Sequence, residues 1–172
     1  MAMSQRQALA LALVSVWIGW TLFMWFAATR SFRTADRVLA KPGPQFAQIL
    51  KPLGQESSRV VLRYFASQVN ATYFRAYGWA QVLLGVAVAV LLGWLAPRDN
   101  TGFVLVCVML AVTLILAVAV EPQIVALGKT LDFNPSPAAV SRFWMLHGAY
   151  TGLDGVKLLL GITLVVRWLL IA

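Results

Sequence analysis

Four long apolar stretches constrain the fold of this chain more than any other feature of its sequence. They cover residues 8–29, 77–95, 103–120 and 143–166. At a rise of about 1.5 Å per residue, helices of this length cross the roughly 30 Å hydrocarbon core of a membrane. The chain is 60% hydrophobic and only 12% charged, whereas soluble domains carry about 25% charged residues. We therefore predict an all-α integral membrane protein, a four-transmembrane-helix bundle that forms one domain over residues 1–172.

Basic residues flank the apolar stretches unevenly and predict the orientation of the chain. Nine lie within residues 30–63 and 129–142, and three lie near the opposite ends of the stretches. Because positive residues are retained on the cytoplasmic side, we expect both termini outside, with loops 30–76 and 121–142 cytoplasmic, in a bacterial inner membrane. The nine are Arg30, Arg33, Arg37, Lys41, Lys51, Arg59, Arg63, Lys129 and Arg142, and the three are Arg6, Arg98 and Arg167.

The net charge of +8 lies mostly in these flanking segments. Anionic lipid is the natural partner of basic residues next to a membrane helix, so we expect contact with membrane lipids and no binding of nucleic acid. The single cysteine, Cys107, cannot form a disulfide within the chain.

The segment 31–72 is the only sizeable part predicted outside the membrane. After Ser57 its apolar residues, such as Val61, Phe65 and Val69, recur at helical spacing, while Arg59 and Arg63 fall on the other side. This pattern predicts a basic amphipathic helix in the cytoplasm. Such a helix either lies on the lipid surface or extends the second span. The more specific alternative is that it forms a docking surface for a partner.

The fourth stretch carries polar residues that a membrane helix normally avoids. His147, Thr151, Asp154 and Lys157 fall on one face at 100° per residue. Since each charge near the centre of a span costs about 2.5–3.5 kcal/mol, we expect Asp154 and Lys157 to pair at i,i+3 and to face the bundle interior. The pair is either a structural link between helices or part of a relay for protons, ions or substrate, and cofactor ligation is the remaining alternative.

Three glycines, Gly148, Gly152 and Gly155, form a second face beside the polar residues. Their small-xxx-small spacing lets another helix approach closely, so we expect a tight packing contact there. Glu121, at the inner end of the third stretch, has two possible places: it meets His147 at similar depth, or it reaches outward to water.

A membrane histidine is a common ligand of haem or chlorophyll, and His147 is therefore a possible cofactor ligand. It is the only histidine of the chain, which excludes a bis-histidine haem within one chain, and a hydrogen-bonded structural histidine is the simpler interpretation. We predict no metal and no cofactor beyond bound lipid. The six carboxylates are scattered along the chain, so we expect no catalytic site and no enzyme.

The start of the fourth helix also has a local signal. Ser136 followed by Pro137 is typical of a helix N-cap and first turn, so we expect this helix to begin there, before the apolar stretch.

Motifs in all four stretches resemble the transmembrane protein 205-like family, a group of four-helix integral membrane proteins without a settled activity. The resemblance implies the same fold and topology and leaves function open. The chain differs from the family pattern in its long segment 31–72 and in Asp154, where the pattern has Asn. The motifs are Trp17-Ile-Gly-Trp with Leu22-Phe23, Tyr73-Phe74-Arg75 leading to Gly78, Glu121-Pro-Gln-Ile-Val-Ala-Leu, and Phe143-Trp-Met-Leu-His-Gly with Leu153.

These observations favour a non-catalytic accessory subunit that packs against other subunits of a larger membrane complex, with lipid or pigment as a possible companion. The alternative is a small transporter of ions, protons or metals that uses Asp154, Lys157 and His147. None of the stretches is broken at its middle, as the spans of transporters commonly are.

Overall fold

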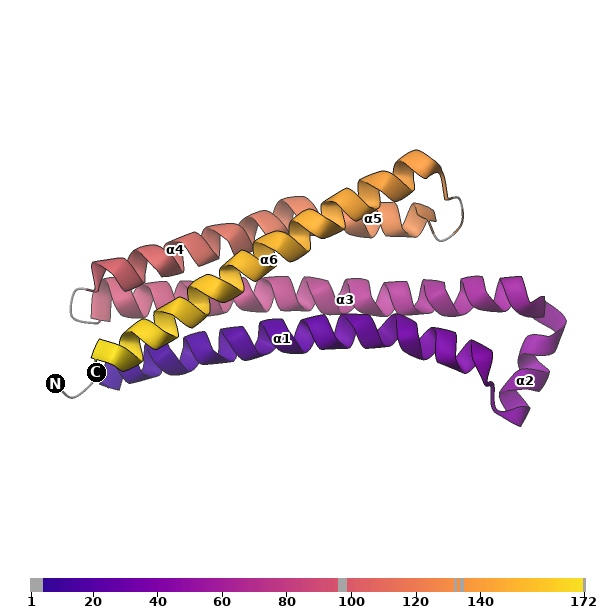
Figure 1. Ribbon diagram of the computed structural model, residues 1–172, viewed down its shortest axis with the longest axis horizontal. Helices are drawn as coiled ribbons and strands as arrows, with labels where there is room; N and C mark the ends of the chain where they lie inside the picture. Colours follow the sequence, from indigo (N-terminus) through magenta and orange to yellow (C-terminus); the bar gives the residue numbers. More distant parts are fainter. Residues whose placement is uncertain (1–4, 96–98, 132, 134, 172) are drawn as a thin grey trace.

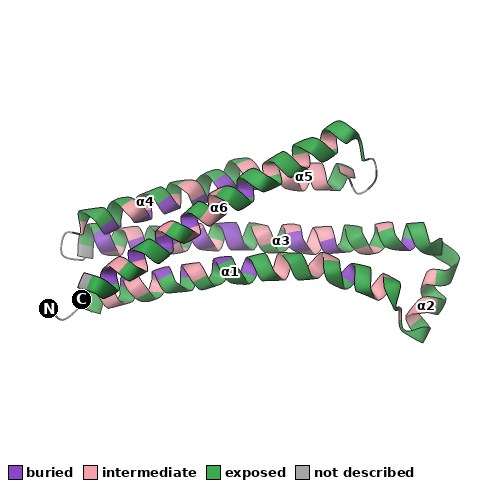
Figure 2. Cartoon of the chain, in the orientation of Figure 1, coloured by how far each residue is buried: buried purple, intermediate pink, exposed green. Residues whose placement is uncertain are grey.

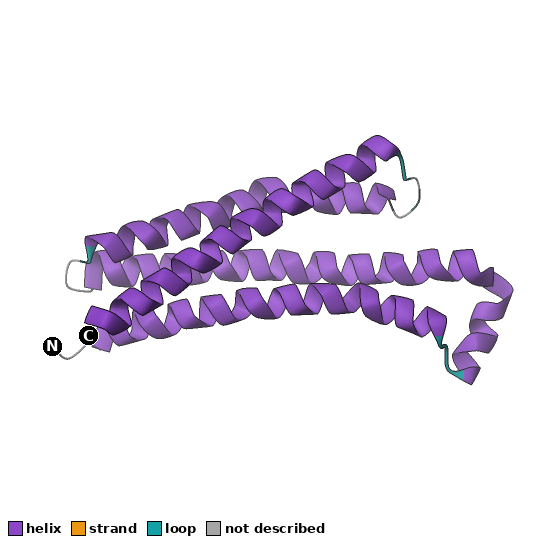
Figure 3. Ribbon diagram, viewed as in Figure 1, coloured by secondary structure: helices purple, strands orange, loops and turns teal. Residues whose placement is uncertain are grey.

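The computed structural model describes residues 5–95, 99–131, 133 and 135–171, and this part of the chain contains helices and no strand (Figure 3). The all-α prediction is confirmed. Four long rods pack against one another: α1, α3, the continuous α4–η3–α5, and α6, which runs obliquely to the others (Figure 1). The elements are α1 (Gln5–Ala40), α2 (Pro44–Leu50), the 3₁₀ turn η1 (Lys51–Leu53), α3 (Gly54–Val90), the π-helical turn η2 (Leu91–Leu95), α4 (Asn100–Ile115), the π-helical turn η3 (Leu116–Val120), α5 (Glu121–Leu131) and α6 (Pro137–Ile171).

Three of the helical stretches are long and apolar enough to cross a membrane. They are Gln5–Ala40, Pro44–Trp94 and Asn100–Leu131, and they cover the first three predicted spans apart from Leu95. The predicted fourth span lies within the 35 residues of α6, which is not among these three stretches, so the fourth span stays a prediction. The N-cap prediction for this helix is confirmed, because the Ser136 hydroxyl accepts a hydrogen bond of 3.2 Å from the backbone N–H of Ala139.

Each rod buries one narrow stripe of side chains. In α1 the buried residues Ala10, Val14, Trp17, Thr21 and Met24 follow one another at steps of four and three residues. This average of 3.5 residues is the repeat by which helices pack along a shared seam in left-handed bundles. Figure 2 shows buried residues recurring at intervals along the rods, with exposed residues filling much of the length between them. The exposed surface is largely apolar, as lipid contact requires.

The amphipathic segment is continuous with the second predicted span and does not lie across the rod. Helix α3 runs unbroken for 37 residues from Gly54 to Val90. Its first half pairs with the end of α1, where Arg63 and Asp36 form a 3.3 Å ion pair and the Asn70 amide donates to the Ala28 carbonyl at 3.3 Å. The short α2 and η1 close this hairpin at its tip, and Gly54, with a φ of +72°, makes the turn into α3 (Figure 1).

The third rod contains a π-helical turn that changes which residues face inward. Its buried residues step by four and three, through Val106, Met109, Thr113 and Leu116, but the next buried residue is Glu121, five positions on. A π turn accommodates one extra residue in a helix. Glu121 therefore takes the inward position that Val120 would occupy in an uninterrupted α-helix.

Candidate functional site

An ion pair between Asp154 and Lys157 of α6 lies at the centre of the bundle. The Lys157 Nζ is 2.5 Å from the Asp154 Oδ1, and the two residues are 1% and 0% exposed. They lie on the same stripe as Gly161, Leu164 and Trp168, the buried residues that follow them on α6. The pairing expected from their i,i+3 spacing is thus present, and it faces the interior of the bundle.

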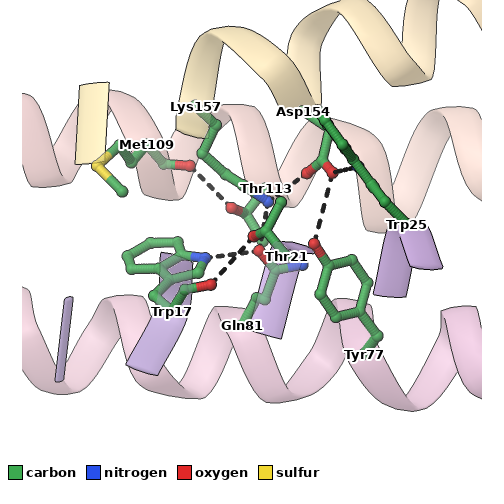
Figure 4. Close-up of polar contacts among 9 residues, drawn as sticks. All are labelled: Trp17, Thr21, Trp25, Tyr77, Gln81, Met109, Thr113, Asp154 and Lys157. Atoms are coloured by element: carbon green, nitrogen blue, oxygen red, sulfur yellow. Dashed lines mark hydrogen bonds and ion pairs between the residues drawn. The ribbon is translucent and has the colours of Figure 1, made fainter. Parts of the chain in front are cut away.

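Side chains from α1 and α3 complete a hydrogen-bonded network around this pair (Figure 4). The Asp154 Oδ2 accepts from the indole N–H of Trp25 at 2.7 Å and from the Tyr77 hydroxyl at 3.5 Å. The Gln81 Oε1 accepts from Lys157 and, at 2.6 Å, from the indole N–H of Trp17. Three rods are therefore linked through one carboxylate, one amide and one ammonium group.

The ionised forms of both residues have several hydrogen-bonding partners. Asp154 accepts hydrogen bonds from three residues, and Lys157 donates to two and lies 5.5 Å from the centroid of the Tyr77 ring. A buried charge is tolerated when it is both paired and hydrogen-bonded, and an aromatic face adds to the stabilisation of an ammonium group. The arrangement suits a structural link between helices.

Trp17 reaches Gln81 because the facing residue of α3 is Gly85. A Cβ atom at Gly85 would lie 2.7 Å from the Trp17 Cη2 and 2.9 Å from the Leu110 Cδ1. Any side chain there would displace the indole ring. Sequence reasoning missed Trp17, Trp25, Tyr77 and Gln81 as site residues. Gln81 did carry a signal, as a lone amide inside an uncharged apolar stretch.

His147 and Thr151 lie on the helical face predicted for Asp154 and Lys157, but they do not belong to the buried network. Both residues are exposed, and the His147 ring packs on its own helix against Phe143 and Trp144, at centroid distances of 5.8 and 5.7 Å. The helical face was correct, since His147 is seven residues before Asp154. However, α6 crosses the bundle obliquely, and its first half lies beside α5 and away from α1 (Figure 1). At that depth α1 does not cover the face.

The prediction of a tight glycine contact is wrong within this chain for two of its three residues. Gly148 and Gly152 are exposed, and a Cβ atom at either would meet nothing within 4 Å. A Cβ atom at Gly155 would lie 3.9 Å from the Trp25 Cη2. The close approach occurs instead at Gly161, where a Cβ atom would lie 3.2 Å from atoms of Ile18 and Met109.

Glu121 lies against α3, which corrects both predicted places for it. The residue is only 7% exposed, and its Oε2 is 3.2 Å from the position that a Cβ atom of Gly78 would take. It does not reach out to water. Glu121 and His147 are both described by the structure, and neither a hydrogen bond nor an ion pair connects them. The cause is the π turn, which rotates Glu121 towards α3.

A second polar cluster lies at the end of the bundle where α4 begins and α6 ends. The Asp99 carboxylate caps α4 through the Gly102 N–H at 3.0 Å, and it accepts from Arg167 at 2.8 Å and from the Trp168 indole at 2.7 Å. Burial raises the pKa of Asp99, but the hydrogen bonds from Arg167, Trp168 and Gly102 outweigh it, so the net pKa lies below the ordinary value. Residues 96–98, Arg98 included, lie outside the described residues.

Within the described part of the chain, no group of three or more His, Cys, Asp or Glu side chains is placed to hold a metal ion. Comparisons with protein-family models, curated proteins and solved structures find no match to this chain. A function for the chain therefore has to be inferred from the geometry of its two polar clusters.

Proposed function

We propose that this chain is a four-span integral membrane protein that acts as a non-catalytic accessory subunit of a larger membrane complex. Its spans are α1, α3, α4–η3–α5 and α6, in a bacterial inner membrane with both termini outside. The resemblance to the transmembrane protein 205-like family belongs to this proposal.

The observation that carries the proposal is that the Asp154–Lys157 network is buried and hydrogen-bonded within the chain. Side chains of α1 and α3 supply the hydrogen bonds of both charged groups, which are fully shielded. A network of this kind holds helices in register and leaves no charged group free for a substrate. Meanwhile large apolar side chains such as Phe23, Trp79 and Trp144 face outward, where lipid tails or helices of other subunits are their natural partners.

Native mass spectrometry tests this role. The complex is extracted from its own membrane in mild detergent, and we expect the 18.8 kDa chain to appear in assemblies with other polypeptides and with bound lipid. A chain that appears alone, or with lipid only, contradicts the proposal.

A small transporter is the second candidate, and one observation favours it. Ionisable groups deep in a membrane helix commonly mark ion or proton pathways, and here Asp154, Lys157 and Glu121 are all buried. Proteoliposome flux of protons and divalent metals separates the two roles, when wild type is compared with the neutral double variant Asp154→Asn/Lys157→Gln, which removes both charges of the pair. We expect no flux above that of empty liposomes, whereas flux that the variant abolishes supports transport.

The proposal includes bound lipid and no other cofactor. His147 packs against two aromatic rings of its own helix, which suits a structural residue. An absorption spectrum of the purified protein checks this part. We expect only the aromatic band in the near ultraviolet, and a stoichiometric haem or chlorophyll band would assign His147 as its ligand.

A further inference from the structure

The α1–α3 hairpin projects beyond the membrane position proposed above. The last uncharged residue of the first span is Thr29, and α1 continues from Arg30 to Ala40. These eleven residues extend the helix by about 16 Å. Lipid headgroups add only about 5–8 Å to each side of the hydrocarbon core. The tip, formed by α2 and η1, therefore stands clear of the lipid surface and faces water.

The tip contains an apolar hollow with a polar rim. The hollow has a volume of about 430 Å³ and lies where the end of α1, α2 and the start of α3 meet. Half-buried Leu39, Pro42, Ala47 and Leu50 line it together with exposed Gln48 and Lys51. Next to it on α2 and η1, Ile49 and Leu53 are 65% and 47% exposed. Apolar surface gathered at one water-facing site is typical of an interaction site.

The surroundings of the hollow are strongly basic. From residue 30 to 63 the chain carries seven basic residues and two acidic ones, a net charge of +5, and all nine are exposed. Complementary potential selects partners and repels those of the same sign. A second copy of this chain would bring an equally basic tip, and anionic lipid lies too far below the hollow. An acidic polypeptide meets both the charge and the distance.

We propose that the tip docks an acidic segment of a partner subunit, with an apolar side chain of that segment in the hollow and its carboxylates near Lys51 and Arg59. This inference rests on the accessory role proposed above, and it adds the surface and the chemistry of the partner. The apolar anchor supplies affinity, while the charges supply selectivity and rapid association.

Site-specific photo-crosslinking in the full-length protein, in its own membrane, tests the proposal. A photoreactive residue replaces Gln48, and a matched control replaces exposed Thr130 on α5. The partner peptide of each adduct is sequenced by mass spectrometry. We expect Gln48 to crosslink to a segment of another polypeptide with net negative charge. We also expect at least a fivefold loss of this adduct in Lys51→Glu/Arg59→Glu and in Ala47→Trp, with Gln45→Trp as the control outside the hollow.

The outcomes separate this inference from the proposed function. An intact complex in native mass spectrometry, combined with adducts from Gln48 to lipid, to a second copy, to a segment that is not acidic, or to nothing, overturns the docking site alone. Absence of any complex removes the accessory role as well. Unchanged melting temperatures of the variants show that a lost adduct reflects the surface and not the fold.

Discussion

At the scale of single residues, the buried ion pair is expected to stabilise the bundle only as a pair. Lys157→Met leaves the Asp154 carboxylate buried without its counter-charge, and loss of one partner of a buried pair costs about 3–5 kcal/mol. The neutral double variant Asp154→Asn/Lys157→Gln keeps hydrogen-bonding groups towards Trp25 and Gln81. We expect it to recover more than half of the loss in equilibrium unfolding in mixed micelles. Exposed Lys129→Met is the control, and a double variant no more stable than the single one would refute this role.

The Asp99 cluster predicts a pH dependence of stability. Since folding lowers the pKa of this carboxyl, its contribution is complete above the unfolded pKa of about 3.9 and disappears as the pH falls through the folded value. The difference in melting temperature between wild type and Asp99→Asn should therefore be largest near pH 6 and should shrink below about pH 4. Asp36→Asn, which changes an exposed ion pair, should show little difference at any pH. A constant Asp99 difference down to pH 3 would contradict this account.

At the scale of secondary structure elements, the π turn of the third rod accommodates one residue more than an α-helix needs. Deletion of Val118, whose side chain is 61% exposed, should convert η3 to α-helix and leave Glu121 on the inward face. We expect this variant to fold with nearly the melting temperature of wild type. Deletion of exposed Val108 should be far more damaging, because it misplaces Met109, Thr113 and Leu116. Equal damage from both deletions would show that the extra residue has another role.

The glycines of the helices divide into packing sites and open sites. Gly85→Ala pushes against the rings and methyl groups of Trp17 and Leu110, and such overpacking costs about 1–3 kcal/mol. Gly152→Ala meets open space and gains up to about 1 kcal/mol of helix propensity. Equilibrium unfolding in detergent should therefore show a lower free energy of unfolding for Gly85→Ala and no decrease for Gly152→Ala. The reverse order would mean that α6 packs through its other face.

At the scale of the whole molecule, the proposed orientation places the two polar ends of the bundle in different compartments. In a Cys107→Ser background, a membrane-impermeant maleimide added to intact spheroplasts should label Thr101→Cys at the Asp99 end. It should label Gln48→Cys at the basic end only after the membrane is permeabilised. Both positions are exposed in the folded chain, so access depends on the membrane alone. Labelling of Gln48→Cys in intact spheroplasts would invert the orientation.

The helical class, the first three apolar helices, the N-cap at Ser136 and the pairing of Asp154 with Lys157 followed from the sequence alone. These features depend on hydrophobicity and on spacings within one turn or one helix, which are local properties. The helical face of His147 was predictable for the same reason. Whether another helix covers that face was not.

Only the tertiary structure decided which residues complete the site. Gln81, Trp17 and Trp25 join the network because Gly85 and the 3.5-residue seams bring three rods together at one depth. The oblique path of α6 leaves His147 exposed, and one π turn directs Glu121 to α3. Crossing angles and register depend on the packing of all four rods at once, whereas the periodicity of each helix is set by its own residues.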